Sequence, residues 1–169
     1  MPNNLSSVLQ KTETKKLYDY QLKDLNRIFE VMNEEPEDFN LLYQLPTGGG
    51  KTVIFSEIAR RYIEMTDKKV LILTHRIELS VQTSSMLEEF GVTNKIINSS
   101  VKTLPDQKDF NCFVAMVETL KNRINDNIFK MDNIGLVIID EAHYNSFRKL
   151  FKYFENCFIW YWYPQYIFV

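Results

Sequence analysis

The chain has 169 residues, 45% of them hydrophobic, which suits one cored domain and is too short for two. Its formal net charge of -2 argues against a general polycation, so any contact with nucleic acid must come from a local patch. Two cysteines, Cys112 and Cys157, support neither a disulfide framework nor a zinc site and fit a reducing cytoplasm. No apolar leader and no run of about 18–20 apolar residues is present, so we expect no membrane segment.

The first 16 residues are polar and predict a flexible N-terminal tail. Tyr18, Leu22, Leu25, Phe29 and Met32 then follow at helical spacing, which predicts one apolar helix face before an acidic loop.

Four nearly continuous apolar runs follow, and each is typical of a strand buried on both faces of a parallel sheet. They read NLLYQL, KVLILT, NCFVAMV and IGLVIID, and helical patterns lie between them at 53–65, 77–90 and 118–124. Alternating strands and helices predict an α/β domain with a mostly parallel open sheet and helices on both faces, over residues 17–158.

The segment LPTGGGKT lies between the first of these strands and the next helix. Its glycines, Gly48, Gly49 and Gly50, allow backbone N–H groups to form an anion-binding nest, to which the helix adds the positive end of its dipole. We expect Lys51 to contact the β- and γ-phosphates of a nucleotide and the Thr52 hydroxyl to bind Mg²⁺. The strict phosphate-loop pattern would require glycine at Leu45, so a plain glycine turn with a surface lysine is the alternative.

The segment GLVIIDEAH places two carboxylates at the end of the fourth predicted strand, the edge of an open sheet where ligands bind. Asp140 there is expected to hold Mg²⁺ opposite Thr52, and Glu141 to orient or deprotonate an attacking water. His143 is expected either to bridge to a neighbouring domain or to be an ordinary surface histidine. A solvated strand end remains the alternative for the acidic pair alone.

These motifs, in this order, resemble the first RecA-like domain of superfamily-2 helicases of the DEAD/DEAH-box type, in which a short P-T-G-x-G-K-T loop is common. The resemblance covers about residues 17–158 and is closer to restriction and repair translocases than to RNA unwinding enzymes. It implies ATP and Mg²⁺ as cofactors, nucleic acid as partner with DNA preferred over RNA, and a second RecA-like domain. It also implies that Thr47 belongs to the ATP site and that His143 belongs to the catalytic machinery.

Further segments carry the resemblance. LYDYQ looks like the segment whose glutamine, here Gln21, reads the adenine edge. In ILTHRIELSVQ, which is similar to motif Ia, Thr74, His75 and Arg76 would meet the nucleic-acid backbone. VAMVETLKNR adds Thr119 and Arg123. Gln21 as an ordinary helix residue, and Arg76 and Arg123 as solvated surface charges, are the alternatives.

The C-terminal segment departs from the family, which has a strand ending in G-x-T-[AG]-T-P. Seven of the last twelve residues are aromatic, and residues 159–169 are expected to form an aberrant tail. Within the domain this tail could at best extend the sheet as a strand up to Pro164. A one-base shift of the codons for residues 160–164 permits Thr-Gly-Thr-Pro, so we expect a frameshifted, truncated motor domain; an aromatic tail that docks a partner is the alternative. Without the arginine finger of a second domain, such a chain would bind Mg-ATP weakly, hydrolyse it slowly or not at all, and unwind nothing. A catalytically silent nucleotide-binding module is the alternative function.

Overall fold

The computed structural model describes residues 17–35, 39–45, 48, 50–100, 107–142, 145–155 and 157–164. It contains one six-stranded sheet in the order β1-β6-β5-β2-β4-β3, and every paired strand runs parallel to its neighbour. The strands are β1 (Asn40–Leu45), β2 (Lys69–Thr74), β3 (Asn94–Ile97), β4 (Cys112–Met116), β5 (Ile134–Ile139) and β6 (Phe158–Pro164). The predicted α/β class with a parallel open sheet is confirmed.

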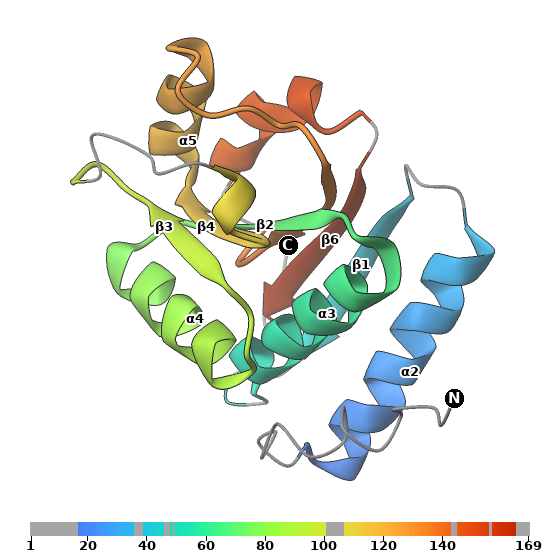
Figure 1. Cartoon of the computed structure of the whole chain (residues 1–169). Helices are drawn as coiled ribbons and strands as arrows, with labels where there is room; N and C mark the ends of the chain where they lie inside the picture. The colour runs from blue at the N-terminus through green and yellow to red at the C-terminus, as the bar shows by residue number, and fades with distance from the viewer. Residues whose placement is uncertain are drawn as a thin grey trace, which may run out of the picture.

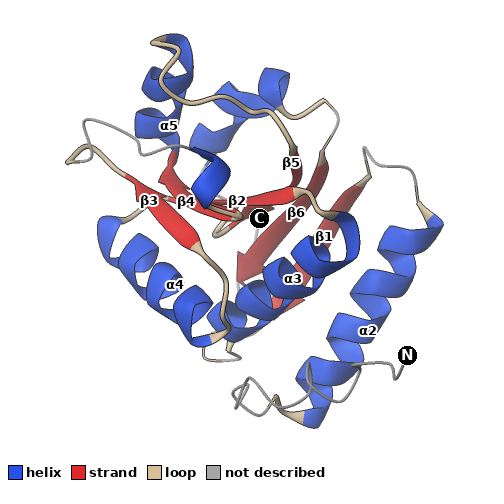
Figure 2. Cartoon of the chain, viewed as in Figure 1, coloured by secondary structure: helices blue, strands red, loops and turns tan. Residues whose placement is uncertain are grey.

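Helices connect the parallel strands, because a parallel pair requires a long crossover between its strands. Between strands lie α3 (Lys51–Thr66), α4 (Ile77–Glu89) and α5 (Val117–Asn125), with the 3₁₀ helices η1 (Gln107–Asp109) and η2 (Asn145–Tyr153). Helix α2 (Asp19–Glu34) precedes β1. The sheet forms the middle layer, with α3 and α4 on one side and α5 on the other (Figure 1; Figure 2). No helix among the described residues has the length and apolarity to cross a membrane.

Alternate residues of the central strands supply two hydrophobic cores, one on each face of the sheet. Val70 and Ile72 of β2 pack in the core that contains α2, α3 and α4. Leu71 and Leu73 point to the opposite core, which contains α5 and η2. All six residues of β5 are buried, so the prediction of strands buried on both faces is correct for the centre of the sheet.

That prediction is wrong for β1, in which Leu42 is 58% exposed. The physical reason is that β1 forms one end of the strand order, so an apolar run does not place it in the interior. The predicted apolar face of α2 also differs from the observed one. Tyr18 is exposed, whereas Gln21 is buried beside Leu25 and Phe29.

The aromatic segment from Phe158 to Pro164 forms β6, which pairs with β1 on one side and β5 on the other (Figure 1). The expected domain boundary at residue 158 therefore coincides with the start of a strand inside the sheet. The expected flexible tail, residues 1–16, and residues 165–169 lie outside the described residues.

Candidate nucleotide site at the carboxyl edge of the sheet

Apart from Gln21, which lies on α2, the predicted site residues that the structure describes lie at or beyond the carboxyl ends of four strands, and parallel strands present these ends at the same edge of the sheet. The glycine loop follows β1, His75 and Arg76 follow β2, α5 follows β4, and Asp140 and Glu141 follow β5. Segments far apart in the sequence therefore meet at this edge.

The glycine loop turns directly into α3. Gly50 is the N-cap of this helix with φ 78° and ψ 36°, and Gly48 has φ 83°. Both conformations lie in the left-handed region, which glycine adopts without a steric penalty. The backbone N–H groups in the first turn of α3 have no partner within the helix and suit an anion such as phosphate. Thr47 and Gly49 lie outside the described residues.

Lys51 joins the glycine loop to the acidic end of β5. Its Nζ lies 3.0 Å from Oδ1 of Asp140 and 3.5 Å from Oε1 of Glu141. The lysine is half-buried, while the Asp140 side chain is only 3% exposed. The structure thus brings together one cation and two carboxylates that are 89 and 90 residues apart in the chain.

Burial raises the pKa of Asp140 above its ordinary value, and the opposing effect of the nearby Lys51 ammonium is smaller. The ammonium partly compensates a carboxylate that has little access to water. Such a carboxylate is suited to a divalent cation, because a cation of higher charge compensates it more completely.

Glu141 adopts a left-handed backbone conformation with φ 52°, which is uncommon for a residue with a side chain. Its Oε2 lies 3.0 Å from Nε2 of His75, while its Oε1 is the atom closest to Lys51. His75 had been predicted as a nucleic-acid contact, and its proximity to Glu141 was not expected. His143 lies outside the described residues.

Gln21 lies at the first turn of α2 with only 2% of its surface exposed. Its Oε1 accepts a 2.9 Å hydrogen bond from the backbone N–H of Tyr18. Its Nε2 is so close to Gly50 that a β-carbon there would lie 2.5 Å away. Gln21 is therefore adjacent to the glycine loop, as a residue of the nucleotide site must be, and its role in reading adenine stays a prediction.

The residues predicted to contact nucleic acid lie at the end of β2 and on α5, which begins at the same edge, and they differ in exposure. Thr74 is buried, and its hydroxyl donates a 3.5 Å hydrogen bond to the carbonyl of Arg76. Arg76 is exposed at the N-cap of α4. Thr119 and Arg123 are half-buried on α5. Their roles stay predictions.

Sequence reasoning missed a small pocket between the acidic strand end and the β2–α4 loop. Thr74, His75 and Asp140 line it from two strand ends, and Ser146 and Phe147 of η2 complete it together with Leu73, Val117 and Ile139. No local pattern in the sequence indicates this pocket, because it depends on β2 and β5 being neighbours in the sheet.

Residues 14–161 match the family described as "Type III restriction enzyme, res subunit". The chain is 36% identical over 120 residues to the putative ATP-dependent helicase IRC3 of Saccharomyces cerevisiae, covering 66% of this chain and 17% of the yeast protein. It is 27% identical over 137 residues to the human (Homo sapiens) protein Helicase POLQ-like, covering 76% and 12%. The chain thus spans less than a fifth of these curated relatives.

Two solved structures have the same fold. The Hef helicase domain of Pyrococcus furiosus aligns with a TM-score of 0.67 at 18% identity, over 98% of this chain and 35% of that chain. The Type ISP restriction-modification enzyme LlaGI, solved with a DNA substrate mimic, aligns with a TM-score of 0.68 at 18% identity, over 92% and 18%. The chain therefore belongs to the family described as the res subunit of Type III restriction enzymes, and its fold is that of the first RecA-like domain of superfamily-2 helicases.

Proposed function

We propose that the chain is the ATP-binding motor domain of a nucleic-acid-dependent ATPase, acting in the cytoplasm and working with a second RecA-like domain. The observation that carries this proposal is the position of Lys51 Nζ, 3.0 Å from Asp140 and 3.5 Å from Glu141. It links the phosphate-binding loop to the two carboxylates that such an ATPase needs for metal binding and for activation of water.

The donor groups at the site fit Mg²⁺ with a nucleotide. Among the described residues, no group of three His, Cys, Asp or Glu side chains could hold a metal alone. Mg²⁺ usually needs only one or two carboxylates, because substrate phosphates and water complete its coordination. Thr52 and Asp140 would hold the ion, which supplies neutralisation of phosphate charge when bound.

The remaining residues of the site take complementary roles. Lys51 would exchange its carboxylate partners for the β- and γ-phosphates, which carry more charge. Glu141 would then accept a proton from the attacking water. Gln21, held against Gly50, would fix the adenine edge.

DNA is the proposed nucleic acid, with RNA as the alternative. Arg76, exposed at the start of α4, is the first candidate for a phosphate contact. Thr74 and His75 lie beside it, and Thr119 and Arg123 lie on α5, which begins at the same edge. The resemblance to LlaGI, whose structure contains a DNA substrate mimic, supports this preference.

A second domain would supply an arginine finger, whose absence costs nucleotide hydrolases about 10³–10⁵ in turnover. The chain alone is therefore expected to hydrolyse ATP slowly and to unwind nothing.

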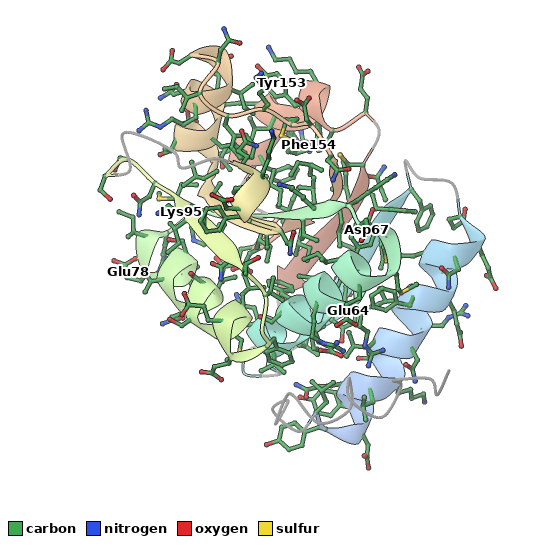
Figure 3. The ribbon with its side chains drawn as sticks, in the orientation of Figure 1. Glu64, Asp67, Glu78, Lys95, Tyr153 and Phe154 are labelled. Carbon is green, nitrogen blue, oxygen red and sulfur yellow. The ribbon has the colours of Figure 1, made fainter. Side chains whose placement is uncertain are left out.

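Titration with a fluorescent ATP analogue in Mg²⁺ tests the proposal. Lys51→Ala should weaken binding at least about tenfold, a loss of roughly 1.4 kcal/mol. Lys95→Ala is the matched control, because Lys95 lies on β3 at the opposite end of the strand order from β1 (Figure 3). Equal affinity of the Lys51→Ala variant and the unmodified chain would contradict the proposed site.

The alternative function is a silent nucleotide-binding module, and ATP turnover with and without single-stranded DNA separates the two. A motor domain should show turnover that DNA stimulates and that Lys51→Ala abolishes. Nucleotide binding without turnover in either condition would favour the silent module.

A further inference from the structure

We propose that His75 is a positioning residue for Glu141 and links the orientation of this carboxylate to the β2–α4 loop. This inference rests on the proposed function, because it gives His75 a part in the same ATPase site. It differs from the role that the sequence predicts for His75, which is a direct contact with the nucleic-acid backbone.

The sheet register places the two side chains beside each other. Leu73 of β2 pairs with Ile139 of β5, and the backbone N–H of Asp140 donates a 2.9 Å hydrogen bond to the carbonyl of Leu73. His75 and Glu141 each lie two residues beyond this pair. Their side chains approach to 3.0 Å between Nε2 and Oε2, and both imidazole nitrogens are buried.

Two different nitrogens lie close to the two oxygens of Glu141. Lys51 Nζ lies 3.5 Å from Oε1 and His75 Nε2 lies 3.0 Å from Oε2. The left-handed backbone of Glu141 costs about 1–2 kcal/mol for a residue with a β-carbon, so surrounding contacts must maintain it. If phosphate engages Lys51, as the proposed function requires, His75 remains as the group that orients the carboxylate.

The β2–α4 loop, to which His75 belongs, is exposed to solvent at Arg76. His75 immediately precedes Arg76, the exposed N-cap of α4, and the Thr74 hydroxyl ties the loop together by its hydrogen bond to the Arg76 carbonyl. His75 also lines the pocket that Asp140 and Ser146 share, so close packing does not enclose the ring on every side. A ligand that shifts the loop at Arg76 would therefore move the partner of Glu141.

The competing explanation is that His75 only fills space in a buried, polar corner of the fold. In that case its replacement would change the stability of the domain but not the relation between two ligands. Thermodynamic linkage distinguishes the two explanations, because coupled sites alter each other's affinity and a structural residue does not produce such coupling.

The test measures the affinity of the full chain for the Mg²⁺ complex of a non-hydrolysable ATP analogue, with and without saturating oligo(dT). The quantity compared is the ratio of the two dissociation constants, measured with and without oligo(dT). In the unmodified chain the two constants should differ by a factor of at least about five, the lower end of typical couplings. His75→Ala should reduce this ratio to about one. His75→Gln, whose amide N–H can reach Glu141, should restore a ratio between the two.

Glu78→Gln is the matched control, because Glu78 is exposed in the first turn of α4, directly after the β2–α4 loop (Figure 3). It should keep the ratio of the unmodified chain. Urea unfolding of each variant checks that it is folded.

Several outcomes would overturn the inference. An unchanged ratio in His75→Ala, or nucleotide binding without any DNA effect in the unmodified chain, would reject it while leaving the proposed nucleotide site intact. Loss of oligo(dT) binding in both His75 variants would identify His75 as a direct nucleic-acid contact instead. Failure of the unmodified chain to bind the analogue would reject the proposed function, and the inference with it.

Discussion

The side-chain amide of Gln21 lies against the backbone of Gly50, where a β-carbon would approach Nε2 to 2.5 Å. This contact joins the first turn of α2 to the first turn of α3, two helices that the β1 strand separates in the sequence. It requires glycine at position 50 for two independent reasons, the close approach and a backbone φ of 78°.

Gly50→Ala should therefore destabilise the domain by about 1–3 kcal/mol, through the left-handed backbone and the displacement of Gln21. Urea unfolding measures this loss, and nucleotide titration should show weaker binding. Adding Gln21→Ala to this variant should recover part of the stability, because the shorter side chain no longer meets the β-carbon.

Gly48→Ala is the control that measures the cost of the left-handed backbone without a steric contact. Gly48 has a similar φ of 83°, but a β-carbon there would meet nothing within 4 Å. Its cost should be about 1 kcal/mol. Equal losses for the two alanine variants would mean that the contact with Gln21 contributes nothing to the stability of the loop.

Asp140 is expected to make the ligand-free domain less stable at neutral pH. Because burial raises its pKa above the ordinary value of 3.8, the unfolded chain ionises first as pH rises. Protonated Asp140 favours the folded state. This contribution to the free energy of unfolding is fully present below pH 3.8 and is lost as pH rises through the higher pKa of the folded state. Asp140→Asn should therefore raise the free energy of unfolding at about pH 7 relative to the unmodified chain.

The same substitution should weaken Mg²⁺-dependent nucleotide binding, because it removes the charged ligand.

Unfolding of Asp140→Asn and the unmodified chain in urea at about pH 4 and about pH 7 separates the electrostatic effect on stability from the effect on packing. The advantage of Asp140→Asn should be larger at the higher pH. A variant that is less stable than the unmodified chain at both pH values would show that the bond to Lys51 outweighs burial.

The central part of the fold could be predicted from local patterns. Runs such as KVLILT predict β2 because a strand buried on both faces is apolar throughout, and Gly91 marks the end of α4 with a φ of 74°. Strand β3 was not predicted, because Asn94 to Ile97 is short and half polar. For β6 the sequence predicts at best a strand that extends the sheet up to Pro164, within a tail whose aromatic sequence replaces the family motif, and the observed strand ends at that residue.

The convergence of Lys51 with Asp140 could be predicted, because both follow strands of one parallel sheet. The approach of His75 to Glu141 could not, because it depends on β2 and β5 being adjacent. Strand order is a long-range property of the fold, and the local periodicity of either strand is compatible with other orders.

Tyr43 connects β1 to α2 through a 2.5 Å hydrogen bond from its hydroxyl to Oδ2 of Asp24. Burial and this bond to a carboxylate raise the pKa of Tyr43 above its ordinary range, so the hydroxyl keeps its proton and donates it. Tyr43→Phe should cost about 1–2 kcal/mol in the free energy of unfolding, because it leaves the carboxylate without its donor.

Tyr153→Phe is the matched control for the loss of a tyrosine hydroxyl. Its hydroxyl donates a 3.0 Å bond to the neutral side chain of Asn125 at an exposed position (Figure 3). Its loss should cost less than about 0.5 kcal/mol. If the two variants lose similar amounts of unfolding free energy, the bond from Tyr43 to Asp24 stabilises the domain no more than an exposed bond to a neutral side chain does.

Glu57 anchors a buried charge network on α3. The side chain is 5% exposed, and its two oxygens accept 2.8 Å hydrogen bonds from Nε and a terminal nitrogen of Arg60 and from Nε of Arg61. Burial alone would raise the pKa of Glu57, but the hydrogen bonds from the two arginines outweigh it and lower the pKa below the ordinary value of 4.5. Glu57→Gln should therefore cost about 2 kcal/mol at about pH 7.

The contribution of Glu57 should depend on pH with a definite sign. Because its folded-state pKa is lowered, the stability it provides is present above pH 4.5 and is lost as pH falls through the folded-state pKa. Glu64→Gln is the control, because Glu64 is 63% exposed and contacts only one terminal nitrogen of Arg60, at 2.9 Å (Figure 3). Its cost should stay below about 1 kcal/mol. A Glu57→Gln deficit that persists unchanged at acid pH would point to lost packing, since protonated Glu57 and glutamine carry the same charge.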